Sequence, residues 1–104
     1  MLTNAKAIVS FLYPRKGMTH FDMDYYLKHH VPATDSSWGS LGMTSCVVYE
    51  TGDGTEYAVN TLTFWKDLAS WEAVKDGEAA QRLAMDIKNF TNVKAVTIVG
   101  KVMN

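Results

Sequence analysis

The stretch FDMDYYLKHHVP, residues 21–32, is the part of the chain that decides most about the fold. Its apolar residues recur at helical spacing, which predicts a short helix. At about 100° per residue, His30 falls inside the apolar stripe, whereas His29 points away from it. The apolar residues of that stripe are Met23, Leu27 and Val31. We therefore expect His30, and not His29, to face the protein interior.

The residues around this helix predict its limits. Thr19 is expected to cap the N-terminus, with Asp22 three residues later in place of the glutamate of a capping box. Pro32 disfavours helical angles at Val31, so the helix is expected to end or kink there. Serines and a glycine at positions 36–39 then predict an irregular stretch.

Four runs of strand length and a second helical region complete the pattern. The hairpin sequence TGDGT at residues 51–55 joins the second and third strands. A cap at Asp67 opens the second helical region, which Asp76 and Gly77 interrupt and which ends at Phe90. The expected strands are residues 5–13, 44–50, 56–65 and 93–103. The order β-α-β-β-α-β predicts an α+β, ferredoxin-like fold, with a four-stranded antiparallel sheet and two helices on one face.

The predicted strands carry apolar residues on both faces. In residues 5–13, Val9 and Phe11 alternate with Ile8 and Leu12. Two helices can cover only one face of the sheet, so the other face would be an exposed apolar patch. A homodimer that packs sheet against sheet is the expected solution.

Length and composition limit the class of protein. The 104 residues have room for a single domain, residues 1–104. A net charge of −1 without a basic patch argues against nucleic acid as a partner. No apolar run is long enough to cross a membrane, and no signal-peptide pattern opens the chain, so a cytoplasmic protein without a membrane partner is expected.

Three elements of the sequence together resemble the EthD family of the dimeric α+β barrel superfamily. They are Tyr13-Pro14, residues 21–32 and Trp38-Gly39. The resemblance implies a homodimer whose sheets form a barrel, with a pocket between helices and sheet in each subunit. The family histidine matches His30. Superfamily members include cofactor-free monooxygenases, cyclases, decarboxylases, isomerases and haem enzymes, so the resemblance does not choose a reaction.

His30 is the candidate catalytic residue, because imidazole titrates near neutral pH and can act as a general acid or base. The alternative is a core histidine that is hydrogen-bonded to a carbonyl or a tyrosine. Tyr26, one turn away on the same side, is a candidate substrate-binding residue, or else a tyrosine whose hydroxyl reaches water. Trp38 is a candidate pocket wall, with core or dimer interface as alternatives.

Two strand residues complete the predicted substrate-binding set. Asn60 interrupts an apolar alternation in the third strand, and Tyr49 alternates with Val47 in the second. Each is a candidate ligand contact, and the alternative for Asn60 is a residue at the solvent edge or an amide satisfied by other groups. Cys46, the single cysteine, is expected to be buried and unreactive. The histidines lack a metal-binding spacing, and we expect neither a metal nor another cofactor.

The first functional hypothesis is a small, cofactor-free enzyme of the EthD type acting on a compact apolar or aromatic oxygenated metabolite. His30 would assist proton transfer during cyclisation, decarboxylation, isomerisation or oxygenation, so a catabolic oxidoreductase is one of the classes covered. The second hypothesis is a non-catalytic accessory protein that binds a small molecule for a degradative oxidase system. The third is a structural dimer without a ligand.

Overall fold

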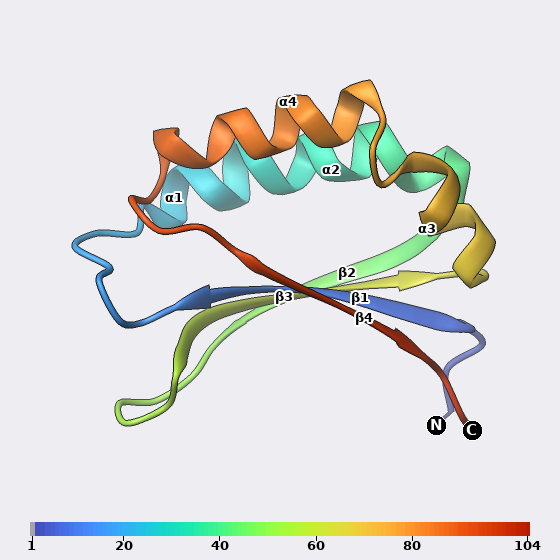
Figure 1. The fold of residues 1–104 in the computed structure, drawn as a ribbon, viewed down its shortest axis with the longest axis horizontal. Helices are drawn as coiled ribbons and strands as arrows, with labels where there is room; N and C mark the ends of the chain where they lie inside the picture. Colours follow the sequence, from blue (N-terminus) through green and yellow to red (C-terminus); the bar gives the residue numbers. More distant parts are fainter. Residues whose placement is uncertain (1) are drawn as a thin grey trace.

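The computed structural model describes residues 2–104 as one sheet with a helical layer on one side (Figure 1). Its strands are β1 (Ala7–Pro14), β2 (Met43–Glu50), β3 (Tyr57–Trp65) and β4 (Val96–Lys101). Its helices are α1 (Met23–Tyr25), α2 (Val31–Trp38), α3 (Leu68–Val74) and α4 (Glu78–Asp86). A π-helical segment (Tyr26–His30) joins α1 to α2, and short 3-10 turns (Gly39–Leu41, Ile87–Asn89) follow α2 and α4.

The sheet has the strand order β2-β3-β1-β4, and every neighbouring pair is antiparallel. In β1, Val9 lies opposite Thr63 of β3 and Val99 of β4. The helical layer formed by α1, α2 and α4 lies over one face of the sheet (Figure 1). The predicted ferredoxin-like α+β architecture is therefore confirmed. We call the helix-covered face of the sheet the inner face and the opposite one the outer face.

The core lies between the inner face and the helices, and it has two centres. One surrounds three tryptophans, Trp38, Trp65 and Trp71, whose ring centroids lie 5.4–5.7 Å apart. The other surrounds Tyr13 and Phe90, which are 2% and 0% exposed. Most of the aromatic pairs meet edge to face, the arrangement that the ring quadrupoles favour. These rings hold the helical layer on the sheet.

The first helix begins later than predicted. Its N-cap is Asp22, whose carboxylate accepts a hydrogen bond of 3.0 Å from the backbone N–H of Tyr25. The prediction of Thr19 as the cap is wrong, because the Thr19 N–H is itself held by the side chain of Asn92 at 2.9 Å. A long-range contact thus keeps residue 19 outside the helix, and an aspartate performs the same capping chemistry one turn later.

The helix was predicted to end or kink at Val31 and to be followed by an irregular stretch at residues 36–39. It does not end there, and the prediction of an irregular stretch is wrong because α2 runs on to Trp38. The π-helical segment, in which the Val31 N–H bonds to the Tyr26 carbonyl, leads directly into α2. Pro32 therefore occupies the first turn of α2, where a missing N–H costs little. The wider π turn also changes the helical phase, and Leu27, predicted to lie inside, is 48% exposed.

The second helical region follows the prediction closely. The Asp67 carboxylate accepts hydrogen bonds from the backbone N–H and the hydroxyl of Ser70, at 2.8 and 2.7 Å. The helical structure is then interrupted at Asp76 and Gly77 before α4 begins. Across residues 2–104, the helices are too short and too polar to cross a membrane.

Candidate active site

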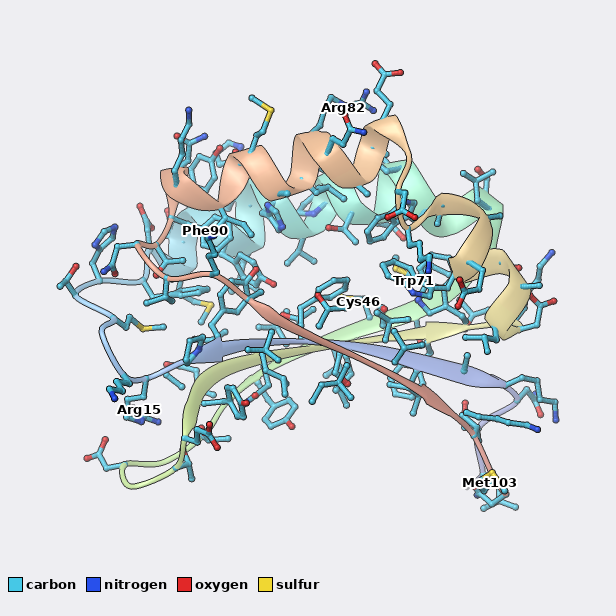
Figure 2. All side chains as sticks on the ribbon, in the orientation of Figure 1. Arg15, Cys46, Trp71, Arg82, Phe90 and Met103 are labelled. Carbon is cyan, nitrogen blue, oxygen red and sulfur yellow. The ribbon has the colours of Figure 1, made fainter. Side chains whose placement is uncertain are left out.

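A cavity of about 600 Å³ lies between α2 and α4 on one side and the inner face of the sheet on the other. Its walls are mostly aromatic and aliphatic, with Phe11, Trp38 and Trp71 among the aromatic ones. Figure 2 shows the side chains of Cys46, Trp71 and Phe90 in the space between the two layers. The volume is in the range of cavities that hold small organic ligands.

His30 lies in this cavity wall, and its ring is fixed by a carboxylate. The side chain is 9% exposed, and Nδ1 lies 2.9 Å from Oδ2 of Asp86. Asp86 is the last residue of α4 and is far from His30 in the sequence. The contact therefore exists only because α4 packs beside the π-helical segment. No described residue forms a hydrogen bond with Nε2 of His30.

Asp86 is held in its ionised form by three donors. Its Oδ1 accepts hydrogen bonds from the Tyr25 hydroxyl at 2.7 Å and from Nδ2 of Asn89 at 2.9 Å. Burial alone would raise the pKa of Asp86, but the hydrogen bonds from Tyr25, Asn89 and His30 outweigh it and leave this pKa below its ordinary value. The same contact raises the pKa of Tyr25, which therefore stays protonated and donates.

This arrangement fixes the tautomer of neutral His30. An ionised carboxylate only accepts hydrogen bonds, so Nδ1 of His30 must carry the hydrogen that Asp86 receives. Nε2 is then the unprotonated nitrogen. A base built in this way can take a proton at Nε2, and Asp86 stabilises the imidazolium that results.

Tyr26 lies beside His30 in the cavity wall. The two rings are nearly parallel, with centroids 5.3 Å apart and an angle of 16° between their planes. The Tyr26 hydroxyl is 2.6 Å from the hydroxyl of Thr61 on β3, and burial raises the pKa of Tyr26. Tyr26 thus supplies a flat neutral surface next to the base, and its hydroxyl is engaged with the sheet.

Trp38 also lines the cavity, at the end of α2. Its ring stacks on Phe11 with centroids 6.3 Å apart and meets Trp71 edge to face at 5.5 Å. The residue is 3% exposed, and its Nε1 has no hydrogen-bond partner within residues 2–104. The structure therefore brings together three of the predicted site residues: His30, Tyr26 and Trp38.

The other two predicted residues lie on the wrong side of the sheet. Asn60 pairs with Tyr49 across β2 and β3, and both side chains project from the outer face. The cavity is lined instead by the neighbouring residues Thr61 and Thr63. The prediction that Asn60 and Tyr49 join His30 at one site is wrong, because side chains alternate along a strand and a shift of one residue changes the face.

The predicted site did not include Asp86 or Cys46. Asp86, the partner of His30, carries no local signal, since acidic residues on a helix are ordinary surface residues. Cys46 is only half-buried and lines the cavity, where burial raises the pKa of its thiol and keeps it uncharged. Within residues 2–104 there is no group of three or more His, Cys, Asp or Glu side chains that could hold a metal ion.

Comparison with known proteins supports the fold. No protein-family model matches the chain, and no curated protein matches it either. Among solved structures, an EthD-like protein of Ralstonia eutropha JMP134 has a TM-score of 0.80 and 18% identity over 96% of this chain and 94% of its own. A dimeric ferredoxin-like protein of unknown function from Jannaschia sp. CCS1 has a TM-score of 0.62 and 19% identity, over 92% and 97%.

SnoaB of Streptomyces nogalater, a cofactor-independent oxygenase, is a third similar structure. Its TM-score is 0.63 with 6% identity, over 96% of this chain and 95% of its own. At these identities the likeness concerns the fold alone. The resemblance to EthD proteins that residues 13–39 indicated is thus confirmed at the level of the fold.

Proposed function

We propose that this chain is a small enzyme of the EthD type that binds a compact apolar or aromatic oxygenated metabolite and uses His30 as a general base. The main support for this proposal is the contact of 2.9 Å between His30 Nδ1 and Asp86 Oδ2 at the wall of a largely apolar cavity. A general base needs an unprotonated nitrogen within reach of the ligand. The contact with Asp86 places the hydrogen of neutral His30 on Nδ1, which leaves Nε2 free to accept a proton, and the cavity gives the ligand access to it. We propose further that the chemistry needs no cofactor.

In the proposed step, His30 Nε2 takes a proton from a weakly acidic O–H or C–H group of the ligand. The ligand becomes a phenolate, enolate or similar anion, and the new imidazolium lies between that anion and Asp86. Tyr26 and Trp38 hold the flat part of the ligand between them. Oxygenation of such an anion by dioxygen is the reaction that the likeness to SnoaB favours. Cyclisation, decarboxylation or isomerisation would begin with the same proton transfer.

A direct test uses 4-nitrophenol, whose ionised form absorbs visible light. Binding to the parent protein is expected to lower the apparent pKa of the nitrophenol by about one unit or more, because the anion gains a cationic partner in His30. His30→Gln should abolish this shift while the nitrophenol still binds. Asp86→Asn should reduce it, since the imidazolium then lacks its carboxylate.

The same variant tests catalysis once a substrate is found. General-base contributions are of order a hundredfold to ten-thousandfold, so His30→Gln should lower turnover by that factor with the fold intact. Full activity in the variant would contradict the catalytic role of His30. If the parent binds ligands tightly but ionises no bound phenol and turns nothing over, the accessory binding protein becomes the better hypothesis.

We propose also that the chain forms a homodimer through the outer face of the sheet. This face carries several exposed apolar side chains in β2 and β4, and no helix of residues 2–104 covers it. They are Val47, Tyr49, Val96 and Ile98, each at least 40% exposed. The similar Jannaschia protein is dimeric, and closing the same face of a second copy over this one would remove the patch from water.

A further inference from the structure

Three buried hydroxyls in the cavity wall are used within the protein. The Thr34 hydroxyl donates to the His30 carbonyl at 3.0 Å, and the Thr61 hydroxyl is paired with Tyr26. Thr63 donates to the Val9 carbonyl and accepts from Nε1 of Trp65, at 2.8 Å each. These three hydroxyls are committed, so they are poor sites for recognising a ligand.

One buried donor in the cavity wall is left over, whereas the charged lining residues are exposed: Glu72, Lys75, Asp76 and Lys94. Nε1 of Trp38 is one of two buried side-chain polar atoms without a partner in the described part of the chain, and the other, on Asn60, lies on the outer face. Trp65, its neighbour in the same cluster, has the same indole donor satisfied by Thr63. A buried donor without an acceptor is unfavourable, so a donor of this kind in a cavity wall points to an acceptor that arrives from outside.

The unpaired indole and the base lie at different positions along the cavity wall. Trp38 follows His30 by eight residues through α2, which is roughly 12 Å along the helix axis at 1.5 Å per residue. Both residues line the same cavity. The wall also carries apolar side chains such as Phe11 and Leu83, and the hydroxyl of Thr34, one turn after His30, is bonded to the His30 carbonyl. His30 and Trp38 therefore each bring a ring nitrogen without a partner among residues 2–104 to the cavity wall.

We propose that Trp38 Nε1 is a specificity-determining donor, and that the ligand is an elongated, flat molecule with an acidic O–H or C–H at His30 and a carbonyl-type oxygen at the Trp38 end. The inference rests on the proposed function for the His30 end. Nε1 is shielded by neighbouring rings, so the proposed contact requires the indole to turn when the oxygen enters. Ring contacts alone hold this indole, which leaves that rotation free of a hydrogen-bond cost.

Two probes that differ by one oxygen test the proposal: 6-acetyl-2-naphthol, with a carbonyl opposite its phenol, and 6-ethyl-2-naphthol, without it. The parent should bind the acetyl probe roughly fivefold to tenfold more tightly, the worth of one hydrogen bond. Trp38→Phe should lose this preference and keep its affinity for the ethyl probe within about threefold. Trp65→Phe, which removes an indole of the same cluster outside the cavity wall, should keep the preference.

A second measurement covers the case in which Trp38→Phe does not fold. In the parent, the indole N–H resonance of Trp38 should move downfield when the acetyl probe is added and stay in place with the ethyl probe. Equal affinity of the parent for the two probes, an unchanged preference in Trp38→Phe, or no binding of either probe would overturn the proposal. His30→Gln should retain the preference for the carbonyl, so a failed ionisation test and a failed Trp38 test remain distinguishable.

Discussion

The two faces of the sheet share the same strands but have different environments. On the inner face, Val9 and Trp65 are fully buried under helices, and the space left over is the cavity. On the outer face, Val47 and Ile98 are 45% and 50% exposed, although both are as apolar as the residues inside. Apolar strand residues alone therefore do not tell which face carries the site and which needs a partner.

The difference shows what each face contributes. On the inner side, contacts between distant elements satisfy several polar groups, as with Tyr26 and Thr61 or His30 and Asp86, and leave Nε1 of Trp38 unpaired within residues 2–104. The outer face has a buried amide on Asn60 whose Nδ2 is unpaired within residues 2–104, among apolar neighbours. Hydrogen-bonded polar pairs such as these can support a catalytic site, whereas an exposed apolar face is suited to contact with a second subunit.

The largest effect on stability is expected on the inner side. Phe90 is fully buried and contacts Tyr13, Tyr26 and His30. Phe90→Ala should lower the free energy of unfolding by about 3–5 kcal/mol, because it leaves a cavity under the helical layer. Urea denaturation followed by circular dichroism measures the change. A loss below about 1 kcal/mol would mean that this cluster does not hold the helices on the sheet.

An intermediate effect is expected on the outer side. Ile98→Lys places a charge in the proposed dimer interface and should weaken association by at least tenfold to a hundredfold, with little effect on the fold of the subunit. Sedimentation at micromolar concentration should then shift from about twice 11.6 kDa toward the single mass. Met85→Lys is the matched control, since Met85 is 68% exposed on α4 and should leave the dimer intact. A monomeric parent protein would remove the interface altogether.

The smallest effect concerns the acid stability of the inner face. The pKa of Asp86 is lower in the folded protein than in the unfolded chain, so its contribution to stability is present above the unfolded value, about pH 4, and is lost as the pH falls through the folded value. Asp86→Asn should therefore flatten the loss of stability below about pH 4. Denaturation midpoints measured at several acidic pH values test this. The control is Asp24→Asn, which removes an exposed ion pair with Lys28 on the surface.

The sequence predicted the order of elements well because hydrophobic periodicity and caps are local signals. Asp67 and the break at Asp76 and Gly77 are examples, and each depends on residues a few positions away. The predicted start of the first helix was wrong because a contact with a distant residue decides it. Thr19 has good local capping chemistry, but Asn92, which is distant in the sequence, binds its N–H.

The sequence by itself determined the ferredoxin-like order, the inward position of His30 and the outward position of His29, because helical spacing places two adjacent side chains on different sides. Tertiary structure alone decided that Asp86 holds His30, that Thr61 binds Tyr26, and that Asn60 lies on the outer face. Contacts of this kind join residues on different elements, and they depend on strand register and on how helices pack. Neither is written in the spacing of one segment, so the base could be found from sequence and its partner could not.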